Sequence, residues 1–165
     1  MPNLFAKGFA MKPYVRDIVR QDLPKILKIE ASSFEFHWSE EDFINCLRRN
    51  NCDCLVAECK DRIVGFVVAE FDEANIHVTN LAVDGNFRRL GVGSQLMAEV
   101  IEGYGNGRFN IVLEVRETNL PAQLFFRRMG FRAVSILRRF YPNTPEEDAY
   151  RMRLRLKPHV LTTTA

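Results

Sequence analysis

Glycines and arginines gather at residues 88–94, which read RRLGVGS, between an apolar segment that ends at Val83 and a helical pattern with apolar residues at 96, 97, 100 and 101. Glycine has no Cβ, so Gly91 and Gly93 let the backbone approach an anion closely and adopt positive φ angles. The helix that follows would direct its unsatisfied N–H groups toward the same point. The order of strand, arginine-glycine loop and helix therefore predicts a phosphate-binding site.

Two common phosphate-binding motifs are absent, and their absence limits the kind of phosphate ligand that the loop could bind. A dinucleotide-binding fingerprint would have a third glycine where Leu96 stands, and a P-loop would continue as Gly-Lys-Ser or Gly-Lys-Thr. Neither pattern is present, so the loop belongs to neither of these two classes.

Glu114 is an ionisable residue inside the apolar segment 111–115, which reads IVLEV and is predicted to be a short buried strand. Burying a carboxylate without a partner costs several kcal/mol. The side chain is therefore expected either at the solvent edge of a sheet or at a place where it does chemistry, and the segment alone leaves both readings open.

Four cysteines lie close together in the sequence, at positions 46, 52, 54 and 59, as the ligands of a metal site often do. Their spacing lacks the repeated C-x-x-C of a zinc site, and the three histidines are scattered. Cys54 and Cys59 would also point to opposite faces of an extended segment. We expect no metal, and free thiols in a reducing compartment.

The composition is that of an ordinary soluble globular protein: 165 residues, 47% hydrophobic and 27% charged. No apolar run reaches the roughly 20 residues that span a bilayer, and the first residues lack a secretory pattern. We therefore predict a cytoplasmic protein without membrane contact, with an N-terminal extension at 1–13 that could be flexible, a single domain at 14–157, and a tail at 158–165.

Charge divides unevenly along the chain. Residues 1–83 hold ten Lys and Arg against thirteen Asp and Glu, whereas residues 84–165 hold thirteen against eight. The basic half begins with the proposed phosphate loop and would favour a polyanionic cofactor, although a solvated surface with a chance asymmetry explains the pattern equally well. No recognised motif supports direct nucleic-acid binding.

Hydrophobic periodicity and capping residues outline the elements. Asp22, Ser39 and Asn119 are predicted to cap helices, and the turn at Lys60-Asp61 predicts a hairpin. Three glycines within 103–107 are expected to end a helix. Leu124, Phe125 and Met129 are predicted to point inward from the helix after Asn119. Strands are predicted at 14–17, 54–58, 63–71, 76–83, 111–115 and 131–137. A last, half-buried strand is predicted where Met152, Leu154 and Leu156 alternate with Arg151, Arg153 and Arg155. The segment 138–142 and an acidic turn at 146–148 would lie between the last two strands.

The loop Arg88-x-x-Gly91-x-Gly93 resembles the pyrophosphate loop of the GCN5-related N-acetyltransferases, which bind acetyl-coenzyme A. Residues 36–39 (FHWS), 80–83 (NLAV), 113–119 (LEVRETN), 129–131 (MGF) and 138–142 (RRFYP) resemble the ribosomal-protein-alanine N-acetyltransferase subfamily. The resemblance covers nearly all of residues 14–157. It implies an α+β fold, with a mixed, mostly antiparallel twisted sheet of about six or seven strands flanked by about four helices.

The resemblance also implies roles for single residues. Glu114 would be the general base, and Trp38 and Tyr141 would contact the acceptor, which would be the N-terminal amino group of a protein, in particular of a small-subunit ribosomal protein. The acetyl-CoA site would comprise Leu81, Ala82 and Val83 along the acetyl-pantetheine arm, Arg88, Arg89, Leu90, Gly91, Val92, Gly93 and Ser94 around the pyrophosphate, and Asn119 and Phe126.

One departure from the family pattern concerns proton donation. The family has a tyrosine, the general acid, where this chain has Phe126, and a phenyl ring cannot protonate the leaving thiolate. A thiol pKa near 8.5 makes this loss tolerable, and Tyr141 is the candidate replacement.

Three alternatives stay open at this point. The enzyme could act on other protein N-termini, it could act on a small amine, or the chain could bind acyl-CoA without catalysis, as a sensor or scaffold. A monomer or weak dimer is expected.

Overall fold

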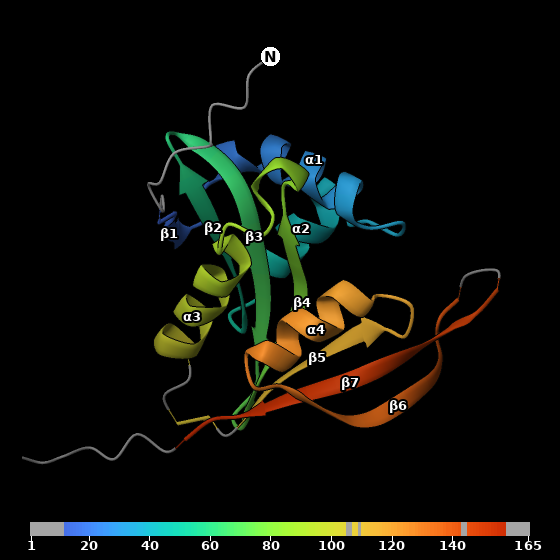
Figure 1. The fold of residues 1–165 in the computed structure, drawn as a ribbon. Coiled ribbons are helices and arrows are strands. Elements are labelled where there is room, and N and C mark those ends of the chain that lie inside the picture. Colours follow the sequence, from blue (N-terminus) through green and yellow to red (C-terminus); the bar gives the residue numbers. More distant parts are fainter. Residues whose placement is uncertain (1–11, 105–106, 109, 143–144, 158–165) are drawn as a thin grey trace, which may run out of the picture.

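A single seven-stranded sheet forms the centre of the structure, a computed structural model that describes residues 12–104, 107–108, 110–142 and 145–157 (Figure 1). The strand order is β1-β2-β3-β4-β5-β7-β6, and every neighbouring pair is antiparallel except β4 and β5. The predicted mixed, mostly antiparallel sheet is therefore confirmed. The strands are β1 Tyr14–Asp17, β2 Cys52–Cys59, β3 Arg62–Phe71, β4 Asn75–Val83, β5 Asn110–Arg116, β6 Arg132–Tyr141 and β7 Glu147–Arg155.

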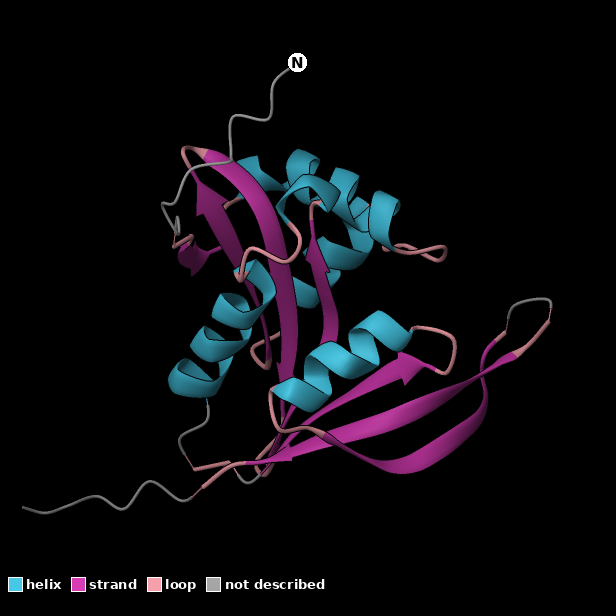
Figure 2. Ribbon diagram, in the orientation of Figure 1, coloured by secondary structure: helices cyan, strands magenta, loops and turns pink. Residues whose placement is uncertain are grey.

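Four α-helices cover the sheet, two on each face (Figure 2). Helices α1 (Leu23–Ser33) and α2 (Glu40–Leu47) pack on β2, β3 and β4 around Phe43 and Phe66. Helices α3 (Val92–Tyr104) and α4 (Leu120–Arg128) lie on the opposite face, over a larger core. Cys54 belongs to the first core and Cys59 to the second, as strand alternation predicts. Two short 3-10 turns, Arg20–Asp22 and Gly85–Phe87, precede α1 and α3.

The turn and two of the three predicted caps are confirmed. Lys60 and Asp61 both have positive φ and join β2 to β3 in a tight hairpin. Ser39 and Asn119 accept hydrogen bonds from backbone N–H groups in the first turns of α2 and α4. Asp22 stands at the N-cap position of α1 as predicted, but its side chain makes no cap hydrogen bond, because its carboxylate binds the Arg16 guanidinium and the Val19 N–H instead. A partly buried ion pair thus replaces the cap hydrogen bond.

Two other predictions near the C-terminus were also wrong. Leu124 is 42% exposed, and the residue that α4 buries is Phe126. Strand β6 extends to Tyr141 and β7 begins at Glu147, so segment 138–142 and most of the acidic turn belong to this hairpin. Arg116 explains the longer hairpin in part, because its guanidinium binds Glu147 and covers the Tyr141 ring.

Some predictions concern residues that lie partly or wholly outside the described residues. Helix α3 continues through Gly103 to Tyr104, whereas residues 105 and 106 lie outside the described residues. The extension before residue 12 and the tail 158–165 lie outside them too. Within the described ranges, no helix is long and apolar enough to cross a membrane.

The parallel contact between β4 and β5 is short. Only three residue pairs form, the last of them His77 with Val112. Beyond that point β4 stays paired with β3 and β5 with β7, while Thr79 is an extra residue in β4, a bulge between the pairs Val68–Asn80 and Ala69–Val78. The two central strands separate and leave an opening in the middle of the sheet (Figure 1).

The prediction of four free thiols was wrong for two of them. Cys46, at the end of α2, forms a disulfide with Cys52, at the start of β2, whereas Cys54 and Cys59 are free and buried. Their sequence positions did not indicate the pairing, because the contact depends on how α2 packs against the sheet. The Glu70 carboxylate lies within 4.8 Å of the two sulfurs and pairs with Arg49.

We predict that opening this disulfide destabilises the protein by about 2 kcal/mol, because a short cross-linked loop restricts the unfolded chain. For a protein of this size the melting temperature would fall by roughly 5 °C. Thermal unfolding with and without a reductant measures the effect. The Cys46→Ser/Cys52→Ser double variant is the control, since a reductant should leave its melting temperature unchanged. An equal response of both proteins to reductant would contradict the prediction.

Candidate active site

A cavity of about 220 Å³ occupies the opening between β4 and β5. It runs between the two faces of the sheet, because its walls come from the end of α1 and the following loop on one side and from α4 on the other. Predicted site residues Leu81, Glu114, Asn119, Phe126 and Tyr141 all line it. The remaining lining residues are Ser33, Phe34, Glu35, Phe36, Val78, Thr79, Leu113, Val115, Arg116 and Ala122.

The predicted phosphate loop lies directly before α3 and includes its first residues. Gly91 has a φ of +84°, and no atom lies within 4 Å of the place where a Cβ would stand, so the backbone there is open to a ligand. Arg89 also has positive φ. The first N–H groups of α3 have no partner within the helix, and an anion at this end would satisfy them. Arg88 donates from Nε to the Val83 carbonyl and so ties the loop to the end of β4.

Gly93 has a role different from the predicted one. Its φ is not positive, but a Cβ would lie 3.2 Å from the ring of Phe125, so the missing side chain lets α3 and α4 pack closely. Gly65 acts similarly on β3, where a Cβ would lie 2.9 Å from the Ala82 carbonyl. Both glycines thus let α3 pack closely, Gly65 against β3 and Gly93 against α4 and the end of β4.

Glu114 lies on an inner strand of the sheet, next to two cationic or protonatable groups. Its Oε2 is 2.6 Å from His77 Nε2 on β4, and its Oε1 accepts a hydrogen bond of 2.9 Å from Arg151 Nε on β7. The Glu114 side chain is only 9% exposed. Of the two readings that the sequence left open, the solvent edge is excluded, because β5 lies between β4 and β7.

The charges of this cluster set the protonation of its members. Burial acts to raise the pKa of Glu114, but the hydrogen bonds and charges of His77 and Arg151 outweigh it and hold the pKa below its ordinary value. The hydrogen bond to Glu114 raises the pKa of His77, against burial. The pair thus holds a carboxylate with a lowered pKa and an imidazole with a raised pKa. Once the imidazole has lost its proton, the pair can take up one proton.

Phe126 and Tyr141 flank the cavity on opposite sides. Phe126 is buried among Phe125 and Phe131, with its ring on the cavity wall. Burial raises the pKa of the Tyr141 hydroxyl, which therefore stays protonated at neutral pH. The Arg116 guanidinium stacks on the Tyr141 ring at 4.0 Å. Tyr141 is thus a fixed hydroxyl donor in the wall of the cavity.

A buried carboxylate fixes the loop between α1 and α2. Glu30 is fully buried, and its Oε1 accepts hydrogen bonds from the Trp38 N–H and from Asn80 Nδ2, each of 2.9 Å. Burial raises the pKa of Glu30. The Trp38 ring packs edge-on against Phe43 and does not line the cavity, whereas Phe34 and Phe36 do. An acceptor-binding role for Trp38 stays a prediction.

Of the other predicted site residues, Ala82 and Val83 do not line the cavity, whereas Asn119 does. Ala82 and Val83 continue β4 past the opening, and their pairing is with Phe66 and Gly65 on β3. Asn119 lines the cavity, but its Oδ1 accepts from the Ala122 N–H, which leaves its amide nitrogen for a ligand.

Sequence reasoning missed His77, Arg151 and Glu30. His77 stands 37 residues before Glu114, and the chain between them contains a helix, so spacing gave no signal that the two side chains meet. The sequence predicts Arg151 only as a residue of an alternating, half-buried strand. The alternation shows that the Arg151 side chain lies on the polar face of its strand, but it does not show which strand lies next to it in the sheet.

Comparison with known proteins now identifies the family. The model of the acetyltransferase (GNAT) family matches residues 15–131. The chain belongs to the GNAT family. It is 33% identical over 137 residues to the [ribosomal protein bS18]-alanine N-acetyltransferase of Salmonella typhimurium, with 81% of this chain and 90% of the relative covered. It is 28% identical over 163 residues to an N-alpha-acetyltransferase of Sulfurisphaera tokodaii, covering 90% and 96%.

Solved structures of GNAT proteins have the same fold. The ribosomal-protein-S18-alanine N-acetyltransferase of Escherichia coli superimposes with a TM-score of 0.80 at 26% identity, over 88% of this chain and 95% of that one. NAA60 of Arabidopsis thaliana in complex with acetyl-CoA gives a TM-score of 0.79 at 23% identity, covering 88% and 99%. The chain is accordingly a GNAT acyltransferase of the N-acetyltransferase type, and the reading as a non-catalytic scaffold is not retained.

We predict that Glu114→Gln lowers the pKa of His77 toward its ordinary value, because the variant removes the carboxylate that stabilises the imidazolium. Titration of the His77 ring signals by NMR measures this, with a His77→Asn variant to assign them. Since folding raises the pKa of His77, its contribution to stability is full below pH about 6.5 and is lost as pH rises through the folded value. An unchanged titration in Glu114→Gln would show that the pair is not coupled.

Proposed function

We propose that this GNAT protein transfers the acetyl group of acetyl-CoA to the N-terminal amino group of a protein, most directly a small-subunit ribosomal protein. The observation that carries this proposal is the placement of the Glu114–His77 pair. Glu114 lines a cavity whose walls come from the end of α1 and the following loop on one face of the sheet and from α4 on the other, and His77 contacts Glu114 from β4.

The residues at the start of α3 fit the diphosphate of acetyl-CoA. The open space at Gly91, the free N–H groups of the first helical turn and the positive charge of Arg89 all favour a polyanion at one point. From there the acetyl-pantetheine arm would follow the unpaired side of β4 past Leu81, toward Glu114. The amide nitrogen of Asn119 would hold the arm on the side of α4.

Proton removal is the step that Glu114 and His77 perform. An α-amino group has a pKa of about 7.7 to 8.0, so a sizeable fraction is neutral and ready to attack. Its nitrogen forms a bond to the thioester carbonyl carbon, the carbon–sulfur bond breaks, and the electron pair leaves with sulfur. The nitrogen gives up one proton, which the pair accepts directly or through a water molecule. Backbone N–H groups of β4 on its unpaired side would polarise the carbonyl.

Tyr141 is the proposed source of the proton for the departing thiolate. Its hydroxyl lines the cavity and stays protonated, whereas Phe126 offers no donor in the family position. Arg116 holds the Tyr141 ring in place and binds Glu147, and it therefore positions the donor rather than giving the proton itself.

The acceptor class is tested by thiol release over a panel of substrates. We expect turnover with peptides that carry the N-termini of the organism's own ribosomal proteins, and lower turnover with unrelated N-termini and polyamines. The Sulfurisphaera relative, an N-alpha-acetyltransferase, favours other protein N-termini as the second candidate. Turnover of polyamines alone would overturn the proposal.

We predict that Glu114→Gln reduces kcat by at least roughly tenfold while acetyl-CoA binding, measured by calorimetry, stays within about twofold of the wild type. The substitution conserves shape and removes the carboxylate that accepts the proton together with His77. Equal kcat in the two proteins would remove Glu114 from the reaction, whereas loss of cofactor binding would indicate a structural defect.

We predict that Tyr141→Phe lowers kcat by roughly tenfold or more, because the substitution removes only the hydroxyl that would protonate sulfur. A second substitution, Phe126→Tyr, placed in that background should restore part of the rate by returning a donor to the family position. Steady-state thiol release measures both. A rate for Tyr141→Phe equal to the wild-type rate would exclude the hydroxyl as the donor.

A further inference from the structure

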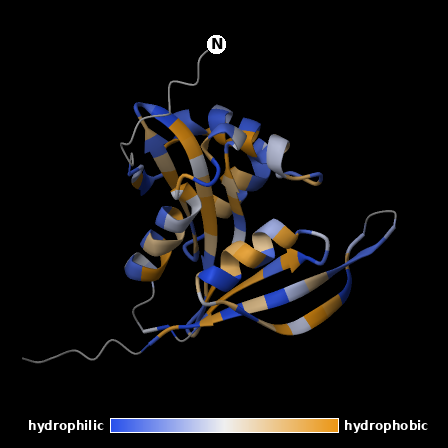
Figure 3. Ribbon diagram, viewed as in Figure 1, coloured by the Kyte–Doolittle hydropathy of each residue, from blue (hydrophilic) through white to orange (hydrophobic). Residues whose placement is uncertain are grey.

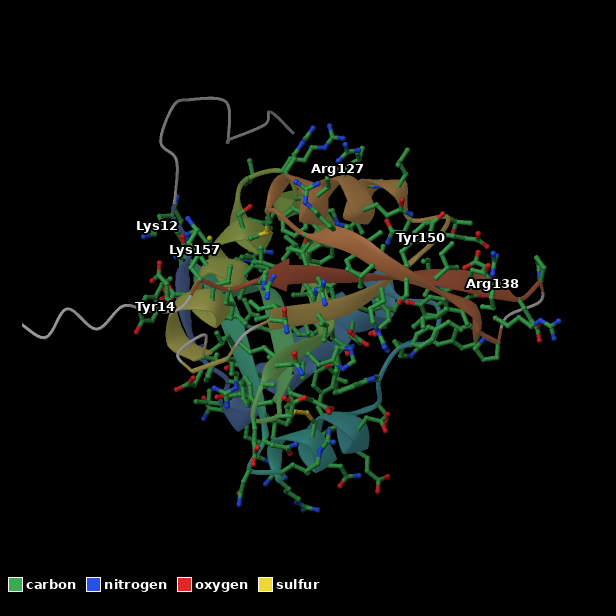
Figure 4. All side chains as sticks on the ribbon, turned by 90° about the horizontal axis from the view of Figure 1, so that it is seen from below. Lys12, Tyr14, Arg127, Arg138, Tyr150 and Lys157 are labelled. Atoms are coloured by element: carbon green, nitrogen blue, oxygen red, sulfur yellow. A yellow bond between two sulfur atoms is a disulfide. The ribbon has the colours of Figure 1, made fainter. Side chains whose placement is uncertain are left out.

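A carboxylate lies beside the disulfide that joins α2 to β2. The Sγ atoms of Cys46 and Cys52 and a carboxylate oxygen of Glu70 all lie within 4.8 Å of one another. The bond between the two sulfurs is drawn in yellow in Figure 4. Glu70 stands directly opposite Cys52 in the antiparallel pairing of β2 with β3, so both side chains leave the sheet on the face that α2 covers. Among the residues that the structure describes, this is the one group of three donors that could hold a metal ion.

The sulfurs are covered by the fold, whereas the carboxylate reaches solvent. Cys46 is 2% exposed and Cys52 is 8% exposed, but the Glu70 side chain is 29% exposed. Glu70 follows residues 63–69 of β3, which are buried and mostly hydrophobic, as the colours along β3 in Figure 3 show. An ion or a water molecule can therefore approach the two sulfurs from the side of Glu70.

Arg49 orients the carboxylate and balances its charge. Its Nη2 donates a hydrogen bond of 2.8 Å to Glu70 Oε1, which leaves Oε2 for a metal ion. Carboxylates that bind metal ions are commonly held in this way by a hydrogen bond to their other oxygen. Two thiolates and a carboxylate around a divalent cation would carry one negative charge in excess, and the guanidinium of Arg49 would neutralise it.

The backbone keeps the two cysteines adjacent without help from the disulfide. The Arg49 N–H donates to the Cys46 carbonyl, and the Cys52 N–H donates to the Arg49 carbonyl. The Phe71 N–H donates to the Asn51 carbonyl and ties the same turn to the end of β3. Because none of these hydrogen bonds involves sulfur, the turn can persist when the disulfide is open. The sulfurs then need only separate to about 3.8 Å, their spacing when each lies about 2.3 Å from one tetrahedral zinc ion.

We propose that Cys46, Cys52 and Glu70 bind a divalent metal ion of the zinc class when the disulfide is reduced. Thiolates and carboxylates are both ligands of Zn²⁺, and a water molecule would complete four-coordination. The thiolates disfavour Mg²⁺ and Ca²⁺, which prefer oxygen donors. The sequence predicted no metal because the cysteine spacing lacks C-x-x-C, but the third donor comes from another strand, which that spacing does not show. The site is independent of the proposed function.

The metal ion and the disulfide exclude each other, because both use the same two sulfurs. A dithiol reductant opens the disulfide by exchange: one of its thiolates attacks one cysteine sulfur, the bond to the other cysteine breaks, and its second thiol resolves the mixed disulfide. The reductant leaves as a disulfide, and the protein holds two thiols. The metal ion then replaces both thiol protons, which pass to water, and no electron is transferred in that step. A dithiol pool would therefore favour the metal-bound form.

Titration of the reduced protein with Co²⁺, a spectroscopic substitute for Zn²⁺, tests the site. The protein is reduced with a phosphine under exclusion of oxygen. We expect an equimolar amount of Co²⁺ to give the charge-transfer absorption of a thiolate ligand, and Zn²⁺ to abolish it by displacement. The oxidised protein should give no such absorption. Zn²⁺ should also raise the melting temperature of the reduced protein and leave that of the oxidised protein unchanged.

Variants of the carboxylate test the third ligand. Glu70→Gln should lower the affinity for Co²⁺ at least roughly tenfold, because a neutral amide replaces the charged donor. Glu58 is the matched control, since it is a partly exposed carboxylate on β2 that also pairs with an arginine, Arg16. Glu58→Gln should bind Co²⁺ as the wild type does. Equal affinities of Glu70→Gln and the wild type would overturn the three-ligand site.

Variants of the cysteines test the other two ligands. Cys46→Ser/Cys52→Ser should lose the thiolate absorption. Cys54→Ala/Cys59→Ala removes the two thiols that the structure leaves free and should keep the absorption. An absent absorption in the reduced wild type, or one that survives in Cys46→Ser/Cys52→Ser, would overturn the inference.

Discussion

The separation of β4 from β5 after His77 is the constraint on which the rest of the site depends. Three parallel pairs hold the two strands together, and the bulge at Thr79 lets β4 diverge from them. A continuous sheet would have used the backbone groups of both strands for its own hydrogen bonds. Because the strands diverge, those groups are free for a ligand, and side chains from both faces of the sheet reach one cavity.

The same separation explains how a carboxylate can be buried in an apolar strand. Glu114 lies near the last parallel pair, where β4 is still close enough for His77 to reach it and β7 supplies Arg151 from the other side. Burial by itself would raise the pKa of Glu114 and favour its neutral form. The interactions with His77 and Arg151 offset this effect. They also make its pKa low, and this is why proton uptake belongs to the pair with His77 rather than to Glu114 alone.

Hydrogen-bonded side chains hold the acceptor side of the cavity as well. Glu30 joins the end of α1 to β4 and to the loop that carries Phe34 and Phe36. Arg116 joins β5 to Glu147 and to the ring of Tyr141. Both groups are used internally, which distinguishes them from Arg153 and Arg155, whose charges face solvent. The acceptor side of the cavity is therefore held by side chains that bind other parts of the fold, and Arg153 and Arg155 lie at the other end of β7.

The sequence by itself determined the features that depend on neighbouring residues. Hydrogen bonds of caps and turns act over three or four residues, so Ser39, Asn119 and the Lys60-Asp61 hairpin were readable, and so was the loop of Gly91. The apolar flanks of Glu114 singled it out for the same reason. Only the tertiary structure decided which groups meet across the sheet. His77 reaches Glu114, and Cys46 reaches Cys52, because helix packing and the strand order β4-β5-β7-β6 bring those segments together, and no local pattern encodes that register.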